Sequence, residues 1–229
     1  MTGAVIVVAG GGPPAPGVAA RLPVGARVIA ADSGLEHAAR LGLTAEVVIG
    51  DMDSVAPAAL EAAAAAGVRV ERHPAAKDAT DLELALDAAL ALRPAHLAVV
   101  SGGDPSRLDH VLAFALLLAE HRFATTSVEA WLGSTHLTVI GAGRTAQLAG
   151  RAGDLVTLLP LHGAAVGVTT SGLLYPLDDE DLPPGTTRGV SNEMLAEVAT
   201  VALRGGVLVA VQPGGPDGTT DPLAGEIPE

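Results

Sequence analysis

Short, continuously apolar runs alternate with longer amphipathic segments over the first half of the chain. The runs contain few polar residues, which is typical of parallel strands that are buried on both faces. The segments between them place apolar residues at helical spacing, as Leu82, Leu86 and Leu90 do. The pattern predicts strands at residues 4–9, 27–31, 47–49, 68–70 and 96–100, and helices at 18–22, 35–41, 57–66, 80–92 and 108–122.

The alternation of strands with helices indicates βαβ units, and therefore an α/β domain with a doubly wound, mostly parallel sheet. After about Trp131 the helical spacing disappears, and short β-branched stretches separated by closely spaced glycines follow. Those stretches, at 137–140, 155–159, 165–170, 198–203 and 207–211, are typical of a small antiparallel β-sandwich or barrel. We expect an α/β domain at 1–132, a β-sandwich domain at 133–212 and a disordered tail at 213–229.

Composition narrows the class of protein. The chain has 229 residues, of which 49% are hydrophobic and 17% charged, as in globular proteins. It has no cysteine, which excludes disulfides and cysteine-ligated zinc. The net charge of −13 argues against a nucleic-acid partner, because binding to a phosphate backbone requires a basic surface. No apolar run approaches the roughly 20 residues that cross a membrane, and the apolar run at 4–9 is too short for a signal peptide. We therefore expect a cytoplasmic protein that has no membrane partner.

Aspartates follow several of the predicted strands. Asp32 follows the strand at 27–31, Asp51 follows the strand at 47–49, and Asp109 lies beyond the strand at 96–100. Parallel strands end on a common edge of the sheet, so these carboxylates can meet there. Mg²⁺ prefers oxygen ligands and usually takes one or two carboxylates together with phosphate oxygens and water. The pattern predicts a site for Mg²⁺ and a polyphosphate.

Asp51 and Asp53 form the sharpest local signal. In an extended turn both carboxylates can reach one cation, and Gly50 would let the backbone come close to a ligand. The alternative is the start of a helix, with Ser54 as the N-cap before Pro57 and with Asp53 stabilised by the helix dipole. Capping requires only one acid, so the pair favours a metal site.

Lys77, Asp78, Thr80 and Asp81 precede or open a predicted helix. Thr80 and Glu83 have the spacing of a capping box, which accounts for both residues. Lys77 is not explained in this way, because a cation beside a helix N-terminus is unfavourable. A phosphate held between Lys77 and the helix N-terminus would remove the conflict.

Arg107, Asp109 and His110 lie between a predicted strand and a predicted helix. The arginine can bind a phosphate through two hydrogen bonds, the aspartate can bind a metal, and the histidine can orient either group. The alternative is an ordinary first turn of a helix.

Tyr175, Ser191 and Asn192 stand out in the second half. Only four residues of the chain are aromatic, and Tyr175 is one of them. Their residue types alone indicate nothing beyond a ring in the core of the sandwich and an ordinary turn.

Six motifs, taken together and in this order, resemble the thiamine pyrophosphokinase family. They are Ala-Asp-Ser-Gly at 31–34, Gly-Asp-Met-Asp-Ser at 50–54, the segment 77–86, Arg-Leu-Asp-His at 107–110, Ser-Gly-Leu-Leu-Tyr-Pro-Leu at 171–177 and Ser-Asn-Glu at 191–193. The sequence departs from the family pattern at Pro105 and Ser106, where a glycine pair is usual, at Phe114, where asparagine is frequent, and at Ser33, where glycine is common.

The resemblance implies an α/β catalytic domain, a β-sandwich that helps to bind thiamine, and a homodimer with sites built across the subunit interface. It implies transfer of a pyrophosphoryl group from ATP to the thiamine hydroxyl, with Mg²⁺ bound and AMP released. By resemblance, the catalytic and metal-binding residues are Asp51, Asp53, Asp81 and Asp109; the residues that contact ATP are Asp32, Lys77, Asp78, Thr80, Arg107 and His110; and those that contact thiamine are Tyr175, Ser191 and Asn192.

Two other functions fit the same acidic framework. One is a pyrophosphokinase that acts on a pterin alcohol, and the other is a non-catalytic nucleotide sensor. Tyr175 and the Ser191-Asn192-Glu193 segment favour thiamine over a pterin, and the complete set of aspartates favours an enzyme over a sensor. Asp81 and Asp109 are both candidates for the base that accepts the hydroxyl proton.

Overall fold

The structure is a computed structural model that describes residues 2–76, 78–104 and 106–215. The chain divides into two compact units, one of Met1–Leu117 with Thr125–Gly133 and the other of Leu118–Ala124 with Ser134–Glu229. Within the described ranges, no helix has the length and apolar character needed to cross a membrane. Lys77 and most of the tail expected at 213–229 lie outside the described residues.

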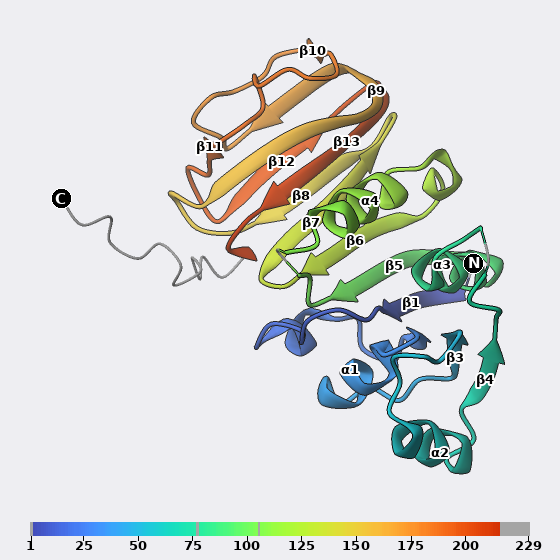
Figure 1. Ribbon diagram of the computed structural model, residues 1–229. Coiled ribbons are helices and arrows are strands. Elements are labelled where there is room, and N and C mark those ends of the chain that lie inside the picture. The colour runs from blue at the N-terminus through green and yellow to red at the C-terminus, as the bar shows by residue number, and fades with distance from the viewer. Residues whose placement is uncertain (1, 77, 105, 216–229) are drawn as a thin grey trace. The chain divides into compact units, whose positions relative to one another are not determined.

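The first unit contains a parallel sheet with the strand order β4-β3-β2-β1-β5-β6 (Figure 1). Its strands are β1 (Thr2–Val8), β2 (Arg27–Ala31), β3 (Val47–Gly50), β4 (Arg69–Arg72), β5 (Pro94–Ser101) and β6 (Ser127–Leu132). The chain moves outward from β1 to β4 and then returns to the other side of β1 with β5. The predicted doubly wound sheet is confirmed, and β1 with β5 marks the point where the strand order reverses.

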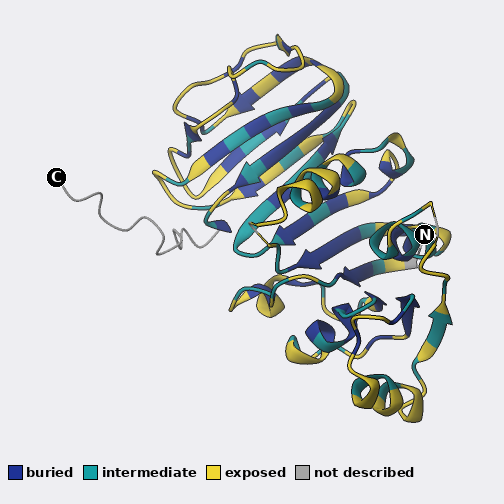
Figure 2. Cartoon of the chain, in the orientation of Figure 1, coloured by how far each residue is buried: buried dark blue, intermediate teal, exposed yellow. Residues whose placement is uncertain are grey.

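Helices cover both faces of this sheet. The α-helices are α1 (Gly34–Arg40), α2 (Pro57–Ala65), α3 (Asp81–Ala91) and α4 (Leu108–Leu118), and the short 3₁₀ turns are η1 (Val18–Arg21) and η2 (His121–Phe123). Leu35 of α1 packs in one cluster with Ile6 and Val8 of β1. Val5 and Val7 point to the opposite face, because side chains alternate along a strand. Helix α3 packs against β1, β2 and β3, and its Leu86 is completely buried. Figure 2 shows β1 and β5 buried along most of their length.

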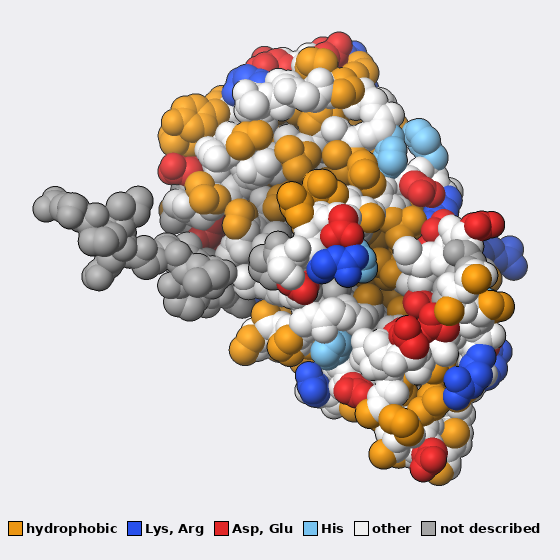
Figure 3. Space-filling view, in the orientation of Figure 1, with side chains coloured by type: hydrophobic (Ala, Val, Ile, Leu, Met, Phe, Trp, Pro, Cys, Tyr) orange, Lys and Arg blue, Asp and Glu red, His pale blue; other side chains and the backbone are white. Residues whose placement is uncertain are grey.

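The predicted helix at 108–122 is shorter than expected. Helix α4 ends at Leu118 and a separate 3₁₀ turn, η2, follows. Leu112 and Leu116 have the helical spacing that is typical of a buried face. They are nevertheless 56% and 45% exposed. Hydrophobic surface is visible over α4 in Figure 3. Trp131, by contrast, is buried in β6.

The second unit is antiparallel, with the strand order β7-β13-β9-β12-β8 and with β10 and β11 also paired to β9. Its strands are β7 (Thr135–Gly141), β8 (Thr145–Ala149), β9 (Leu155–Ser171), β10 (Glu180–Leu182), β11 (Asn192–Glu193), β12 (Val198–Ala202) and β13 (Gly205–Gln212). One hydrophobic cluster fills its interior and includes Ile140, Leu158, Val168, Val201 and Leu208. The predicted change from an α/β to an antiparallel β architecture is confirmed.

Strand β9 joins two strands that the sequence analysis had separated, at 155–159 and 165–170. Its first part pairs with β13 and its last residues pair with β12, so one strand contributes to both sides of the core. His162 and Gly163, with φ values of 58° and 140°, lie where the register shifts. The chain therefore bulges there and does not reverse, and the glycine that suggested a turn marks a bend within one strand.

Helices α3 and α4 both carry leucines at helical spacing, and they provide a test of this fold. Leu86→Ala should cost about 2–5 kcal/mol of unfolding free energy, because the side chain it removes is fully buried. Leu112→Ala, the matched change on α4, should stay within about 0.5 kcal/mol, since Leu112 is largely exposed. Urea unfolding of both variants measures the difference, and equal losses would contradict the packing of α3 and α4 described above.

Candidate active site

A pocket of about 410 Å³ opens at the carboxyl edge of the parallel sheet, within the first unit. Its walls come from the segments that follow the strands: Gly10 after β1, Asp32 after β2, Ser54 after β3, Thr80 and Asp81 after β4, Gly103 and Asp104 after β5, and Leu132 at the end of β6. This is the edge at which ligands bind in open α/β sheets, at the point where the strand order reverses.

Three aspartates gather at this edge. Asp32, Asp51 and Asp53 each offer a carboxylate oxygen, and these oxygens all lie within 4.8 Å of one another. The backbone N–H of Asp53 donates to Asp51 Oδ1 at 3.2 Å, and Met52 between them has a φ of 66°, so a tight turn places both carboxylates together. The pKa of Asp53 is raised, first by the negative charge of Asp51, then by burial and by the charge of Asp32. A cation would relieve this repulsion.

Asp32 has an environment that its sequence pattern did not reveal. It takes the left-handed backbone region at φ 48°, and Ser54 Oγ donates a hydrogen bond to its Oδ2. Its Oδ1 is buried and has no hydrogen-bond partner among the described residues. The alternative in which Ser54 caps a helix is wrong, because α2 has Ala56 as its N-cap and no capping side chain. Ser54 instead orients Asp32 and leaves one carboxylate oxygen available.

Gly50 and Asp81 lie beside the group of three aspartates. A Cβ atom on Gly50 would lie 3.1 Å from Asp81 Oδ1 and 3.2 Å from Asp32 Cβ, so the absence of a side chain allows these groups to approach. The charge of Asp81 also contributes to the raised pKa of Asp53. Thr80 Oγ1 accepts a hydrogen bond from the backbone N–H of Glu83 at 3.2 Å, which confirms the predicted helix cap. Asp78 is exposed and does not line the pocket.

Arg107 and His110 line the same pocket, whereas Asp109 does not. Arg107 donates to both carboxylate oxygens of Asp109, at 3.0 and 2.8 Å, and also contacts the His110 ring. This ion pair lowers the pKa of Asp109 to about 2. The structure therefore brings Asp32, and not Asp109, together with Asp51 and Asp53 in the part of the chain that it describes.

Glycines form the side of the pocket nearest β1 and β5. The N–H of Gly12 donates to the carbonyl of Gly103 at 3.1 Å, and a Cβ atom on Gly102 would collide with the backbone of Gly12. Two loops thus meet backbone to backbone, which only glycine permits.

Two buried polar side chains hold the first glycine loop. His37 Nε2 lies 3.1 Å from the Gly11 carbonyl, so this nitrogen is the protonated one, and Ser101 Oγ donates to the Gly10 carbonyl at 3.0 Å. Both side chains are nearly inaccessible, at 6% and 8% exposure. The sequence analysis missed them, because a single histidine on a helix and a serine at a strand end have no distinctive spacing.

In the second unit, Tyr175 is 53% exposed, so the alternative interpretation of its ring as part of the sandwich core is wrong. Asn192 is only 2% exposed, and its side chain accepts from the Tyr175 N–H at 2.9 Å and donates to the Tyr175 carbonyl at 2.7 Å. Ser191 is exposed with a φ of 56°, and its N–H donates to Thr157 Oγ1 at 3.1 Å. The buried amide of Asn192 fixes the backbone of an exposed aromatic residue.

Comparisons with known proteins match a range of the chain in each of the two units. Residues 25–130 match the family model described as thiamin pyrophosphokinase, catalytic domain, and residues 145–208 match the model of the thiamin pyrophosphokinase vitamin B1 binding domain. The protein named thiamine pyrophosphokinase from Bacillus subtilis (strain 168) is 25% identical over 186 residues, which cover 80% of this chain and 86% of that protein.

Solved structures with the same fold include two with closely similar names. The crystal structure of thiamine pyrophosphokinase from Bacillus subtilis matches with a TM-score of 0.77 at 24% identity and covers 91% of this chain and 98% of that one. The thiamin pyrophosphokinase from Geobacillus thermodenitrificans matches with a TM-score of 0.74 at 25% identity and covers 91% of this chain and 96% of that one. The two family models together match more than half of the sequence, so the chain belongs to the thiamine pyrophosphokinase family, whose members form thiamine pyrophosphate.

Proposed function

We propose that this protein transfers a pyrophosphoryl group from ATP to the hydroxyl of thiamine and releases AMP, with Mg²⁺ bound by the aspartates of the first unit. The observation that supports this most is the group formed by Asp32, Asp51 and Asp53 beside a pocket at the carboxyl edge of the sheet. Phosphoryl-type transfer depends on positioning and on neutralising charge more than on covalent chemistry by the protein. A homodimer in the cytoplasm remains part of the proposal.

The three carboxylates fit a divalent cation with oxygen ligands. Their oxygens are close enough to share one ion, and a buried oxygen of Asp32 has no hydrogen-bond partner in the described part of the chain. The raised pKa of Asp53 expresses the same crowding of negative charge. A bound Mg²⁺ would neutralise charge on the phosphate oxygens of ATP.

The rest of the pocket suits a polyphosphate. The glycines at 10–12 and 102–103 allow close approach to the backbone, and the N-terminus of α3, capped by Thr80, favours an anion. Arg107 lines the pocket and is held by an exposed ion pair, which costs little to rearrange when a phosphate competes for it. Lys77 lies outside the described residues, and its phosphate contact stays a prediction.

Asp81 is the better candidate for the base that accepts the hydroxyl proton. It lines the pocket, whereas Asp109 does not. Asp109 is paired with Arg107, and its pKa of about 2 makes it a poor proton acceptor near neutral pH.

Tyr175 supports thiamine as the acceptor. An exposed aromatic ring on a fixed backbone can stack on a heteroaromatic ring without first being ordered. Ser191 is exposed next to Asn192 and is proposed to contact the same ligand. Asn192 is proposed to act by holding Tyr175, because its amide already bonds to the tyrosine backbone.

Replacement of the metal-binding carboxylates tests the first half of the proposal. Asp51→Asn or Asp53→Asn should abolish most turnover, because each removes a carboxylate proposed to bind the metal. Thermal stability should stay nearly unchanged, because only one of several crowded negative charges is lost. Glu61→Gln, an exposed change on α2, serves as the control and should behave as wild type. Steady-state rates at limiting Mg²⁺ and melting curves provide the measurement. Wild-type turnover by either aspartate variant would remove that residue from the metal site.

Tyr175→Ala tests the second half of the proposal, which is the contact with thiamine. The thiamine KM should rise strongly and the ATP KM should barely change. The free energy of unfolding should fall by no more than about 0.5 kcal/mol, because the ring is largely exposed. Kinetics with each substrate varied in turn, together with urea unfolding, measure all three quantities. An unchanged thiamine KM would contradict the proposed contact.

Product analysis tests the reaction type. Thiamine and ATP should give AMP and thiamine diphosphate in equal amounts, and only with a divalent metal present, because attack at the β-phosphorus leaves AMP. Chromatography of the products identifies the nucleotide. ADP with thiamine monophosphate would exclude pyrophosphoryl transfer, preference for a pterin alcohol would favour the first alternative, and no turnover with either acceptor would favour a nucleotide sensor.

A further inference from the structure

Tyr175 lies in a segment whose backbone is fastened on both sides of the ring. Leu174 donates its N–H to the Glu193 carbonyl at 2.9 Å, and Asn192 bonds to both the N–H and the carbonyl of Tyr175. Two residues further along, the N–H of Leu177 donates to Thr170 Oγ1 at 2.9 Å, and the Leu177 side chain is buried at 1% exposure. The peptide between these points, at Pro176, lies outside the strand pairing of the second unit.

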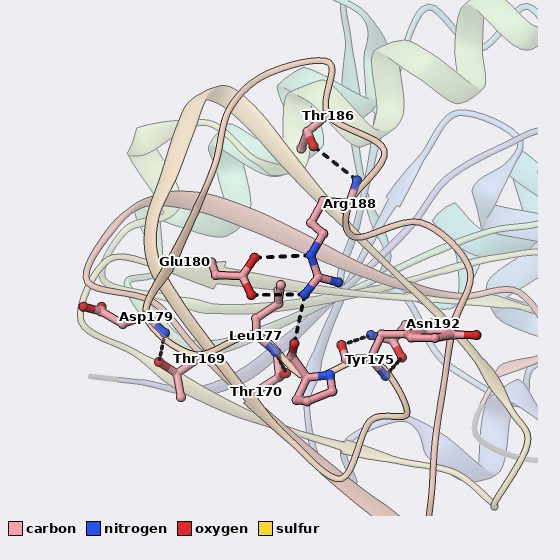
Figure 4. A network of polar contacts seen from close by, with 10 residues as sticks. Thr169, Thr170, Tyr175, Leu177, Asp179, Glu180, Thr186, Arg188 and Asn192 are labelled. Carbon is pink, nitrogen blue, oxygen red and sulfur yellow. Dashed lines mark hydrogen bonds and ion pairs between the residues drawn. The ribbon is translucent and has the colours of Figure 1, made fainter.

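Arg188 binds that peptide. Its Nη2 donates to the Pro176 carbonyl at 3.0 Å (Figure 4). The same guanidinium forms a two-point ion pair with Glu180, with Nε to Oε2 at 3.2 Å and Nη2 to Oε1 at 3.0 Å. The backbone N–H of Arg188 donates to Thr186 Oγ1 at 3.1 Å, so the residue that holds Pro176 is itself anchored.

The geometry requires an arginine at this position. A guanidinium presents donors in a rigid planar fork, so it can bind a carboxylate through two nitrogens and still reach a carbonyl. A lysine ammonium is a single point of charge and does not reproduce this arrangement. Arg188 and Glu180 are 42% and 41% exposed in their side chains, and an ion pair this exposed contributes little to overall stability. Its effect is therefore local and falls on the Pro176-Leu177 peptide, directly after Tyr175.

We propose that Arg188, oriented by Glu180, is a positioning residue that holds the Tyr175 ring in place for the aromatic part of the substrate. The inference rests on the proposed thiamine contact of Tyr175. Stacking requires a defined ring plane, and a segment that is ordered before binding loses less conformational entropy when the ligand arrives. Loss of the guanidinium frees the Pro176 carbonyl and lets the ring sample other orientations.

The chain contains one tyrosine, so biosynthetic labelling with 3-fluorotyrosine gives a single ¹⁹F resonance that reports on residue 175. In the full-length protein without substrate, Arg188→Met should move this resonance toward that of free fluorotyrosine and narrow it. Arg188→Lys should restore it only in part. Glu180→Gln should shift it in the same direction by less, because the arginine can still reach Pro176.

The same variants are measured by kinetics. Arg188→Met should raise the thiamine KM by on the order of tenfold, the usual effect of losing a charge-assisted hydrogen bond, and leave kcat and the ATP KM within about twofold. Arg27→Met is the matched control. Arg27 forms an ion pair with Glu46 of the same kind, with both side chains 47% exposed, in the first unit. This control should leave the resonance and the thiamine KM unchanged.

The outcomes separate this inference from the proposed function. An unchanged ¹⁹F resonance in Arg188→Met would overturn the positioning role, whatever the kinetics show. A changed resonance with an unchanged thiamine KM would overturn the link between ring position and substrate affinity. The proposed thiamine contact fails on a different result, namely an unchanged thiamine KM in Tyr175→Ala, which does not depend on Arg188.

Discussion

Repulsion between carboxylates at one edge of a parallel sheet is the constraint on which the first unit depends. Asp32, Asp51 and Asp53 place oxygens within 4.8 Å of one another, and the raised pKa of Asp53 shows that the folded chain holds them there at an electrostatic cost. Backbone connections impose this proximity, because Asp32 ends one strand and Asp51 ends its neighbour. The fully apolar interiors of β1, β2, β3 and β5 supply the stability that offsets the cost.

The same arrangement explains the glycines that surround the pocket. A side chain on Gly50 would separate Asp32 from Asp81, and one on Gly102 would push apart the two loops that face each other. Polar side chains then fix the loops: His37 of α1 holds Gly11, and Ser54 holds Asp32. The geometry of the candidate site is therefore set in part by residues outside the acidic group.

The sequence predicted the architecture well for a physical reason. Strands buried on both faces must be apolar throughout, so β1, β2, β3 and β5 are visible as uninterrupted runs, and the change of periodicity near Trp131 marks the antiparallel region. Prediction from the sequence failed where tertiary contacts determine the local structure. Gly163 resembles a turn residue but bends a single strand, and Leu112 has core spacing but is exposed.

The same difference between local sequence signals and tertiary contacts applies to the candidate site. The Asp51-Met52-Asp53 turn is local, and its prediction as a pair of adjacent carboxylates agrees with the geometry. The partner of Asp32, unlike that of Asp109, is not encoded locally. Asp109 has a cation two residues away that binds it, whereas Asp32 meets Ser54 from another strand end, across 22 residues of sequence. Spacing alone could not distinguish which aspartate joins the acidic group.

In both units, buried or anchored polar groups thus hold the backbone or side chain of a candidate site residue. In the second unit, Asn192 can do this for Tyr175 because a carboxamide offers both an acceptor and a donor, and so satisfies the N–H and the carbonyl of one residue. An apolar residue of similar size would leave both peptide groups without partners in a site that is 2% exposed. The supporting residue is therefore more constrained by folding than the ring it supports. This explains how a surface aromatic can be specialised for a ligand while its position is determined by the interior of the domain.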